Sequence, residues 1–471
     1  MKIALVYPSL CDSSFNVSGE PILFNHMHRG LCYLSSVCKK EGFTDIHLID
    51  LRILCDWDEF KDQVSKLKPD VVGITVMSPD YNYAVKCIDI IKDLDIKIKT
   101  VVGGMHPTIM AEEMIANDNV DYIITGEAES AFVELLRKIK TGEKPQRVVK
   151  GELADVNSLP FEDRELFNCL ERPYDFFLPP PFVTVLASRG CPYQCKFCAP
   201  GSKLMHGNRI RRRTVDNVIE ELKFLRDMYG FKSLQFWDDC FGVDKKWVFE
   251  FCEKYMKNGF NQPFMCLMRS DIICRNAEMM KKLKKAGMAM ALIGFESGND
   301  RVLKFVNKGT TVKQNLRACR ICQKTGIKVW ALHMYGMPTE TNEEALDTMR
   351  IIRKMKPWRS NTAFYTPFPG SYFHEYCKKN DLSLIGDHEG FVTFPEDDVP
   401  KIKNIDYDFM RKAAHDSKDL SLRVKLWIRF EKGSAHKASK TFRKKFEKEI
   451  ERNPSLNKMT ILRKAHQAGR I

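Results

Sequence analysis

Short apolar runs alternate with longer amphipathic segments through most of this 471-residue chain. In the first 145 residues, the apolar runs have the length and composition of buried strands. The segments between them, such as YAVKCIDIIKDL, combine helical spacing with one charged face. Strands that alternate with helices predict a parallel sheet covered by helices on both faces. The predicted strands are KIALVYP, DIHLIDL, DVVGITV, IKTVVGG and VDYIITG.

A second alternation begins at residue 182, after a stretch that ends in three consecutive prolines. Such a stretch fits neither a helix nor a central strand, so it predicts a linker. At least six further strand–helix units follow, which indicates a full or partial barrel. We therefore predict an α/β protein of four parts. These are an N-terminal doubly wound parallel sheet (1–145), a linker (146–181), a partial TIM-type (β/α)6 barrel (182–385) and a helical, basic C-terminal region (386–471).

Positive charge is concentrated at the C-terminal end. The net charge is +14, and residues 401–471 alone contain 20 Lys and Arg against 8 Asp and Glu. A basic segment of this kind can bind nucleic acid, an anionic membrane surface or an acidic partner, or it can be a solvated helical face. The segment has few aromatic residues, which disfavours nucleic acid. Peripheral membrane contact remains an open alternative.

The sixteen cysteines indicate a reducing compartment, because the N-terminal stretch reads as a core strand and no secretory signal is recognised. No apolar run is long enough to span a membrane. We therefore expect a cytoplasmic protein, with association at a membrane surface left open. Most of the cysteines are expected to be inert core residues. They include Cys32, Cys38, Cys87, Cys169, Cys319 and Cys322.

Three cysteines in RGCPYQCKFCAP, residues 189–200, form the most specific motif. Cys191, Cys195 and Cys198 have C-x3-C-x2-C spacing and follow a predicted strand directly. Thiolates suit zinc and iron–sulfur clusters, and a structural zinc site would require a fourth protein ligand, which the sequence does not supply nearby. On a four-iron cluster, three cysteines leave one iron open to a substrate or cofactor. Phe197, beside the last cysteine, would shield such a cluster from water.

The predicted strands of the first domain end in small residues and glycines. In an open α/β sheet, ligands bind beyond these carboxyl ends, where glycine lets a flat ligand approach the backbone. Met77, Ser78 and His106 stand at such strand ends and are candidates to contact a bound ligand. The candidate residues of this edge are Ser9, Met77, Ser78, Gly103, Gly104, His106, Gly126 and Glu127.

The motif RGCPYQCKFC resembles the signature of the radical S-adenosylmethionine (SAM) enzymes. The resemblance implies a [4Fe-4S] cluster whose open iron is chelated by SAM. It also implies that electron transfer cleaves SAM to a 5′-deoxyadenosyl radical, which abstracts hydrogen from the substrate. A reducing partner of the flavodoxin or ferredoxin type would supply the electron.

Later strand ends extend the resemblance over roughly residues 182–372. Asp238 and Asp239 match the motif that contacts the methionine part of SAM. Arg269 and Ser270 resemble the strand end that holds its carboxylate, and a guanidinium is suited to grip a carboxylate with two hydrogen bonds. The resemblance also places Glu296 near the ribose hydroxyls, and Pro338, in YGMPTET, near the adenine.

The first domain resembles the cobalamin-binding domain of one radical SAM class, on the loops VVGGMHPT and DYIITGEAE. The segment DIHLID contains an Asp-x-His pair like that of another cobalamin domain type, but Asp50 stands where glycine is required. His47 is therefore predicted to be a core or edge residue, and the lower axial ligand of cobalt stays open. A flavodoxin-like domain without a cofactor is the alternative.

The resemblance implies an enzyme that combines cobalamin with radical SAM chemistry. Methyl transfer to an unactivated carbon of a small-molecule or lipid-like substrate is the favoured activity. Oxidative cyclisation or rearrangement, as in the anaerobic magnesium-porphyrin ester cyclases, is the first alternative. Methylthiolation of RNA or protein is the second, although the expected second set of cluster cysteines is missing. A non-enzymatic cobalamin- or nucleic-acid-binding protein is the third.

Overall fold

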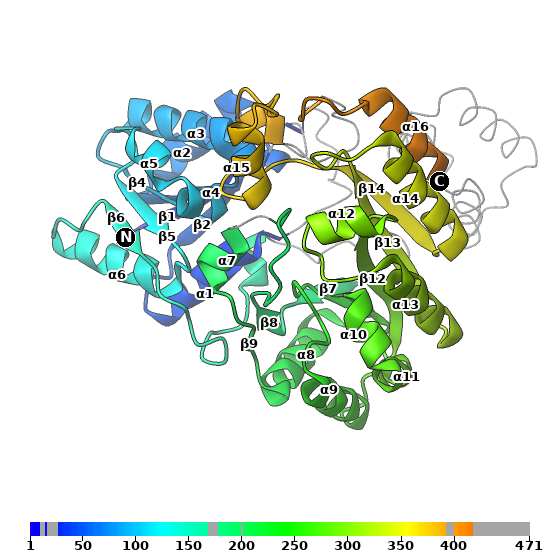
Figure 1. Ribbon diagram of the computed structural model, residues 1–471. Coiled ribbons are helices and arrows are strands. Elements are labelled where there is room, and N and C mark those ends of the chain that lie inside the picture. Colours follow the sequence, from blue (N-terminus) through cyan, green and yellow to red (C-terminus); the bar gives the residue numbers. More distant parts are fainter. Residues whose placement is uncertain (10–14, 17–26, 168–177, 199–200, 392–399, 418–471) are drawn as a thin grey trace, which may run out of the picture.

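Two parallel six-stranded sheets organise the molecule, which is known here from a computed structural model that describes residues 1–9, 15–16, 27–167, 178–198, 201–391 and 400–417. The first sheet lies in the N-terminal part, drawn in blue and cyan in Figure 1. The second lies in the part drawn in green and yellow. The α/β class predicted from the alternation of apolar runs is confirmed.

The first sheet has the strand order β2-β1-β3-β4-β5-β6, and every pair is parallel. All five predicted strands are present. A sixth, β6, falls within residues 146–181, so its three residues extend the sheet into the predicted linker. The strands are β1 (Ile3–Tyr7), β2 (Ile46–Asp50), β3 (Val71–Thr75), β4 (Lys99–Gly103), β5 (Tyr122–Thr125) and β6 (Val148–Lys150).

Alternate residues of the first strand enter two separate cores, which is the signature of a doubly wound sheet. Ala4 and Val6 pack in the core that also contains residues of α2 and α3. Ile3 and Leu5 pack in the core with residues of α1 and α6. The helices of this part are α1 (Arg29–Lys40), α2 (Trp57–Leu67), α3 (Tyr81–Leu94), α4 (Met105–Ile109), α5 (Ala111–Ile115) and α6 (Glu129–Thr141), with 3-10 turns η1 (Leu51–Ile53) and η2 (Ser78–Asp80).

The second sheet has the order β7-β10-β11-β12-β13-β14, again with parallel neighbours. Among the described residues its two edge strands do not pair, so the sheet is an open, partial barrel, as predicted. The strands are β7 (Phe182–Val185), β10 (Ser233–Phe236), β11 (Phe264–Met268), β12 (Met288–Glu296), β13 (Lys328–Tyr335) and β14 (Arg359–Phe364). A separate antiparallel ribbon joins β8 (Ser188–Arg189) to β9 (Arg211–Arg212).

Helices cover the outer face of the second sheet, where one large core contains Cys319 and Cys322, both buried as expected. Side-chain caps fix where several helices begin. Thr311 and Thr341 each form a capping box with the residue three positions later. The helices are α7 (Gly201–His206), α8 (Val215–Tyr229), α9 (Lys245–Lys257), α10 (Ser270–Arg275), α11 (Ala277–Ala286), α12 (Asp300–Phe305), α13 (Val312–Lys324) and α14 (Asn342–Met355); η3 (Arg164–Phe167) precedes β7.

The chain after the last strand covers both parts of the molecule. The helix α15 (Tyr372–Lys379) and the 3-10 turn η4 (His388–Phe391) follow β14, and η4 lies against η2 and α3. The helix α16 (Tyr407–Ser417) packs on α14 through a small core that includes Met410 and Ala413. Most of the basic tail, residues 418–471, lies outside the described residues, so its predicted helicity and membrane contact stay predictions.

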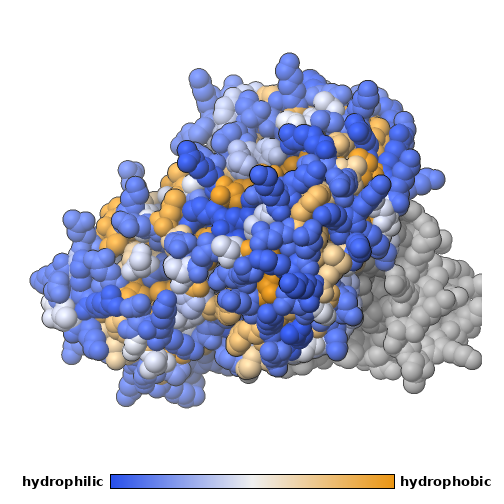
Figure 2. Space-filling view, turned by 90° about the horizontal axis from the view of Figure 1, so that it is seen from below, coloured by the Kyte–Doolittle hydropathy of each residue, from blue (hydrophilic) through white to orange (hydrophobic). Residues whose placement is uncertain are grey.

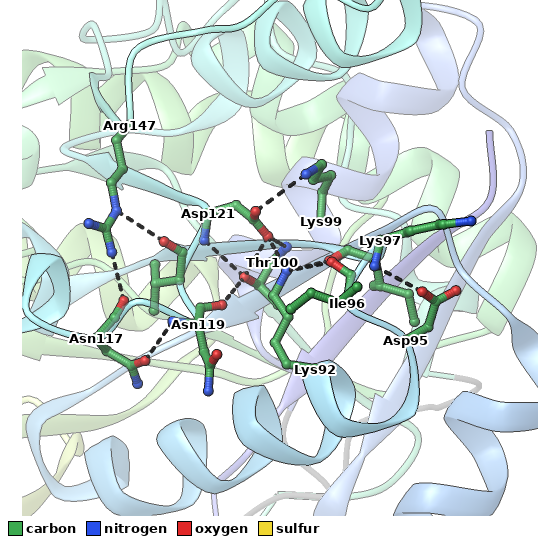
Figure 3. A network of polar contacts seen from close by, with 12 residues as sticks. Lys92, Asp95, Ile96, Lys97, Lys99, Thr100, Asn117, Asn119, Asp121 and Arg147 are labelled. Carbon is green, nitrogen blue, oxygen red and sulfur yellow. Dashed lines mark hydrogen bonds and ion pairs between the residues drawn. The ribbon is translucent and has the colours of Figure 1, made fainter.

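The amino ends of β4 and β5 are closed by a polar network (Figure 3). Asp121 accepts hydrogen bonds from the backbone N–H of Thr100 at 2.8 Å and from Lys92 Nζ at 2.6 Å. Arg147 donates to the backbone carbonyls of Asn117 and Val120. These groups at the amino ends are paired with one another, whereas ligands of parallel α/β sheets bind beyond the opposite, carboxyl ends of the strands.

Hydrophilic residues predominate on the face seen in Figure 2, and the hydrophobic ones form small patches between them. Among the described residues, no helix combines the length and apolar character that crossing a membrane requires.

Candidate functional site

The three motif cysteines lie on the loop between β8 and α7, beyond the carboxyl end of β7. Cys191 and Cys195 are half-buried, and Cys198 is exposed. All three are free thiols. Among the described residues, they do not form a group whose Sγ atoms all lie within 4.8 Å of one another. Ligands of a single zinc ion would be closer together, whereas a multi-iron cluster separates its cysteines.

Anionic groups gather around Cys191. Burial raises the pKa of its thiol, and the nearby Asp239 and Cys195 raise it further, against a lowering by the backbone N–H of Tyr193. Thiolates held in this arrangement repel one another, and a cationic metal cluster would offset that repulsion. The donor set therefore fits an iron–sulfur cluster bound by Cys191, Cys195 and Cys198.

The residues that follow α12 hold the cysteine loop in place. The backbone N–H of Lys196 donates to the carbonyl of Val306 at 2.9 Å. Asn307 Nδ2 donates to the carbonyl of Gln194 at 2.7 Å. These two bonds fix the cysteine loop to the segment that follows α12.

Arg269 reaches the cysteine loop from the end of β11. Its Nη1 donates to Cys195 Sγ at 3.7 Å, and its Nε donates to Asp271 Oδ1 at 3.0 Å. A third bond from Nη2 reaches the carbonyl of Lys308 at 2.5 Å, and the guanidinium lies 3.5 Å from the ring centroid of Tyr193. The guanidinium is thus a positive charge held beside a cluster ligand. Ser270 begins α10 and is fully buried, with no hydrogen-bond partner for its Oγ among the described residues.

Glu296 ends β12 at a β-bulge and has a positive φ of 61°. Its Oε1 accepts a 2.6 Å hydrogen bond from Lys308 Nζ, which lies 5.6 Å from the ring centroid of Phe197. Gly294 makes room for this carboxylate, because an added Cβ would lie 2.3 Å from Glu296 Oε1. A bulge and a strained backbone that redirect a carboxylate toward the cysteine loop are typical of a functional position.

Asp238 and Asp239 are adjacent in the sequence but have different surroundings in the structure. Asp238 is buried, accepts hydrogen bonds from Ser188 Oγ and the backbone N–H of Ala187, and so ties β10 to the start of the cysteine loop. Burial raises its pKa to about 6, although those two bonds lower it. Asp239 lines the cavity described below. Of the two, Asp239 is therefore the one placed to meet a ligand, and Asp238 supports the loop.

The turn that contains Pro338 is organised by Glu340. Its Oε2 accepts hydrogen bonds from the backbone N–H groups of Gly336, at 2.7 Å, and Met337, at 3.1 Å. The second oxygen is buried and has no hydrogen-bond partner among the described residues. Burial raises the pKa of Glu340 to about 7, against the lowering effect of the two backbone bonds. Glu340 thus shapes the turn proposed to lie near adenine.

A cavity of about 370 Å³ lies at the carboxyl ends of β3, β4 and β5. Its wall continues across to the second sheet through Arg189, Gly190, Trp237 and Asp239, so it opens beside Cys191. The volume is in the range of ligand-binding pockets, and the lining is mostly apolar. Of the predicted residues of this edge, five line it: Met77, Gly103, Gly104, Gly126 and Glu127.

Glycines form the floor of this cavity. Gly104 has a φ of +106°, and an added Cβ would lie 3.0 Å from both Thr75 Oγ1 and the carbonyl of Val76. Gly126 has a φ of +79° and approaches the backbone of Gly151. Gly103 is different, because its added Cβ would meet only Ile124 O, at 3.7 Å. A flat, largely apolar ligand that lies on backbone, such as a corrin, fits this surface.

Glu127 connects the cavity to the cysteine loop. It is buried and accepts hydrogen bonds from His206 Nδ1 at 2.6 Å, from Arg211, and from the backbone N–H of Ala154 at 2.8 Å. Arg189 Nη1 lies 3.4 Å away and also pairs with Glu129 at 2.6 Å. Burial raises the pKa of Glu127, but the bonds from His206 and Arg211 outweigh it and bring the pKa to about 2. The ionised carboxylate thus links the two parts of the molecule, and this set of contacts is called the Glu127 joint.

The other predicted residues of the first edge do not line the cavity. Ser9 follows β1 and is buried. Ser78 Oγ is hydrogen-bonded to His106 Nδ1 at 3.1 Å, and His106 is fully buried on the side of η4. Burial lowers the pKa of His106 to about 4, despite the nearby Glu113. His47 is exposed on the edge strand β2, which agrees with the prediction of a core or edge residue.

Two families of known domains match this architecture. The Radical SAM superfamily matches residues 185–352, which include the cysteine loop and the strands β10–β13. The B12 binding domain family matches residues 18–136, which include most of the first sheet and its glycine-lined edge. This chain therefore contains a radical SAM domain and a B12-binding domain.

Curated relatives of this radical SAM protein are methyltransferases and cyclases. An uncharacterized methyltransferase of Pyrococcus horikoshii is 29% identical over 426 residues, which cover 86% of this chain and 88% of the relative. The anaerobic magnesium-protoporphyrin IX monomethyl ester cyclase of Rubrivivax gelatinosus is 26% identical over 390 residues, covering 79% of this chain and 69% of the cyclase.

Solved structures of cobalamin-dependent radical SAM enzymes share the fold. The methyltransferase TsrM of Kitasatospora setae, with cobalamin and a [4Fe-4S] cluster bound, superposes with a TM-score of 0.61 at 18% identity, over 81% of this chain and 75% of TsrM. OxsB, with aqua-cobalamin and S-adenosylmethionine bound, gives a TM-score of 0.66 at 15% identity, over 99% of this chain and 74% of OxsB.

Several residues that shape the radical SAM site are missing from the sequence predictions. Arg189 lies just before the cysteine motif, and Glu129 lies in the same TGEAE loop as Glu127. The opposite charges of these two loops are the sequence signal that could have predicted the ion pair between Arg189 and Glu129. His28 lines the cavity, accepts the N–H of Leu31 at Nδ1 and contacts Thr75 Oγ1 through Nε2 at 3.3 Å. No local pattern marks His28, because only the fold brings it to β3.

The basic stretch HGNRIRRRT has an internal role in this radical SAM protein. Arg211, Arg212 and Arg213 pair with Glu127, Asp244 and Glu221. The positive charges of these three arginines are therefore paired with carboxylates of the same chain.

Proposed function

We propose that this protein is a cobalamin-dependent radical SAM methyltransferase that adds a methyl group to carbon in a small organic or lipid-like substrate. The observation that carries the proposal is one cavity that both parts of the chain line. The glycines of the first sheet line it from one part, and Gly190 and Asp239, which precede Cys191 and Cys240 in the sequence, line it from the other. Two cofactors bound at these edges would face one substrate.

The proposed methyl transfer requires the cofactors bound at the carboxyl ends of both sheets. When bound, the cluster supplies the electron that cleaves SAM, and cobalamin supplies the methyl group. The chain's own part is to hold and orient: Cys191, Cys195 and Cys198 bind iron, while Arg269 holds a positive charge 3.7 Å from Cys195 Sγ. In this proposal Glu296, held by Lys308, would contact the ribose hydroxyls of SAM, and Asp239 would contact its methionine part.

The apolar cavity wall excludes water from the space between the two edges. Leu186, Trp237 and Met205 contribute to it from the second part of the chain, and Phe132 from the first. Exclusion of water protects a reactive radical from side reactions. The Glu127 joint keeps the two edges in register, since its partners Arg189, Arg211 and His206 all belong to the second part.

Radical cyclisation is the second candidate, favoured by the 26% identity to a magnesium-protoporphyrin ester cyclase over most of this chain. Methylthiolation is a weaker one, suggested by a putative methylthiotransferase of Methanocaldococcus jannaschii that is 27% identical over 354 residues. In the described part of the first domain, Cys32, Cys38 and Cys87 are each buried in a core, so they are unsuited to hold a second cluster.

The first experiment is anaerobic purification with cluster reconstitution, followed by iron and cobalamin analysis and an assay of 5′-deoxyadenosine and S-adenosylhomocysteine. We expect about four irons and one cobalamin per chain, with both nucleoside products formed under reducing conditions. About eight irons would favour methylthiolation. A protein that binds both cofactors but never forms 5′-deoxyadenosine with a strong reductant would contradict the proposal.

A further inference from the structure

Three potential metal ligands meet outside the site described above. His106 lies on α4 and Glu113 on α5, while His388 comes from η4, almost three hundred residues later. One ligand atom from each lies within 4.8 Å of the other two. His106 Nε2 is 3.2 Å from Glu113 Oε2, and His388 Nε2 is 2.6 Å from Glu113 Oε1.

Protein groups leave this cluster incompletely satisfied. His106 is fully buried, and its Nε2 has no hydrogen-bond partner among the described residues. The Oε2 atom of Glu113 lies 3.2 Å from that nitrogen, and it is also buried without a hydrogen-bond partner among the described residues. A buried imidazole nitrogen and a carboxylate oxygen that face each other without a hydrogen bond leave polar atoms that are costly unless a further partner is present.

The other ring nitrogen of His106 is held as in a metal-binding histidine. Its Nδ1 lies 3.1 Å from Ser78 Oγ. A proton on Nδ1, donated to that hydroxyl, leaves the lone pair of Nε2 directed at Glu113 and His388. Outer hydrogen bonds of this kind fix the tautomer and orientation of histidine ligands. The ring of Tyr81 adds an aromatic wall, with centroids 5.0 Å from His106 and 4.0 Å from His388.

We propose that His106 Nε2, the Glu113 carboxylate and His388 Nε2 bind one divalent transition-metal ion of the zinc type. Two imidazoles and a carboxylate suit zinc, whereas calcium and magnesium prefer oxygen ligands only. Zinc bonds of about 2.0–2.1 Å in tetrahedral geometry separate ligand atoms by about 3.3 Å, close to the 3.2 Å between His106 Nε2 and Glu113 Oε2. Water supplies the fourth ligand.

The site is open to an ion from solution on one side. The Glu113 side chain is 30% exposed and that of His388 is 17% exposed, while His106 forms the closed side. The ion would fasten η4, which belongs to the C-terminal part of the chain, onto the first domain. Met105, the neighbour of His106, lines the cavity, so the same ion would steady the loop between β4 and α4. Its role is to stabilise this contact, and it takes part in no redox step.

The test uses the full-length protein with its cluster reconstituted anaerobically, so that the motif cysteines are occupied by iron. After removal of loosely bound metal with a chelator, the protein is titrated with Zn²⁺, and bound zinc is measured by mass spectrometry. We expect one zinc per chain. His388→Ala and Glu113→Gln should weaken this binding by at least about 100-fold, above the effect of outer-shell changes at metal sites.

Matched variants separate this site from unspecific binding. His47 also pairs with a carboxylate, Asp45, at 2.7 Å, but belongs to no three-ligand group among the described residues, so His47→Ala should bind zinc like the wild type. His388→Cys should keep the ion and add one sulfur ligand, visible in the zinc X-ray absorption spectrum at about 2.3 Å. The wild type should show nitrogen and oxygen ligands only.

Two results would overturn the proposal. The first is equal zinc binding by the wild type, His388→Ala and Glu113→Gln. The second is a wild-type spectrum dominated by sulfur, which would place the ion on cysteines.

Discussion

The two sheets have contrasting edges: that of the first sheet lines the cavity, and that of the second lies next to the cavity, which it reaches through Gly190. The edge of the first sheet is defined by Gly103, Gly104 and Gly126 and is called the glycine edge. The edge of the second sheet is defined by Cys191, Cys195 and Cys198 and is called the thiol edge. The glycine edge offers bare backbone and apolar walls. The thiol edge offers metal ligands beside charged groups that are already paired, such as Arg269 with Asp271.

The contrast teaches that the two edges recognise ligands in different ways. Backbone without side chains selects a ligand by shape and by the area it covers, as suits a corrin. Thiolates select a ligand by coordination and charge, as suits a cluster. A steric change should therefore break the first edge and leave the second intact, and a change of ligand atoms should do the reverse.

The largest effect is expected at the thiol edge. Cys198→Ala removes a cluster ligand, so the iron content should fall from about four per chain to below one, and 5′-deoxyadenosine formation should drop by at least about 100-fold. Cobalamin binding should persist. Cys274→Ala is the matched control, because Cys274 is half-buried like Cys191 and Cys195 but only donates to the carbonyl of Gln314. A Cys198→Ala protein that keeps its iron would remove Cys198 from the ligand set.

The reverse experiment fills the glycine edge. Gly103→Phe should project a ring into the cavity and lower the cobalamin content at least about tenfold, since packed interiors tolerate little overlap. Iron content should stay unchanged. Gly103→Ala is the control, because its added methyl would make only an ordinary contact, at 3.7 Å. Full cobalamin occupancy in the Phe variant, measured by absorption after extraction, would show that cobalamin binds elsewhere.

A third experiment loosens the joint between the edges. Glu127→Gln leaves Arg211 and His206 without their buried carboxylate partner, while Arg189 keeps Glu129. The change should lower the free energy of unfolding by about 3 kcal/mol. Glu134→Gln, which breaks the exposed pair with Lys138, should cost less than about 0.5 kcal/mol. Denaturant unfolding measures both.

The stabilising effect of Glu127 has a predictable pH range. Its pKa of about 2 lies below its ordinary value of 4.5. The effect should therefore be complete above pH 4.5 and should disappear as the pH falls toward 2. A Glu127→Gln variant as stable as the wild type at pH 7 would show that the joint contributes nothing.

An effect no larger than that of Glu127 is expected at Glu340, behind the turn that contains Pro338. Its pKa is raised from 4.5 to about 7, so its protonated form favours folding below pH 4.5, and that contribution is lost as the pH rises through 7. Glu344 adds negative charge nearby and Arg301 positive charge. The free energy of unfolding of the wild type should therefore fall between pH 5 and 8 more than that of Glu340→Gln, by about 3 kcal/mol at most. Parallel pH profiles of the two proteins would contradict this.

The sequence predicts most of the fold and both edges because their signals are local. Apolar runs mark every strand of the two sheets except the short edge strand β6, and cysteine spacing marks the thiol edge. Glycines at strand ends mark the glycine edge, and three of them line the cavity. Each of these signals depends on residues that are close together in the chain.

The remaining features depend on contacts between distant residues. Nothing in the sequence around His388 reveals that it meets His106 and Glu113. The prediction that His106 contacts a ligand of the glycine edge also differs from its position, because α4 turns the imidazole toward η2 and η4, away from the cavity. Likewise Asp238 and Asp239 are equivalent in sequence, and only the packing of Asp238 against Ser188 distinguishes them.

The central claim, methyl transfer at a site shared by both edges, is tested most directly by isotope transfer. The protein carrying both cofactors is incubated anaerobically with reductant, trideuteromethyl-labelled SAM and candidate substrates, and the products are analysed by mass spectrometry. We predict a product that carries one added trideuteromethyl group, absent with Cys198→Ala and with Gly103→Phe. A product of unchanged carbon number that forms along with 5′-deoxyadenosine would contradict the claim and identify the protein as a cyclase.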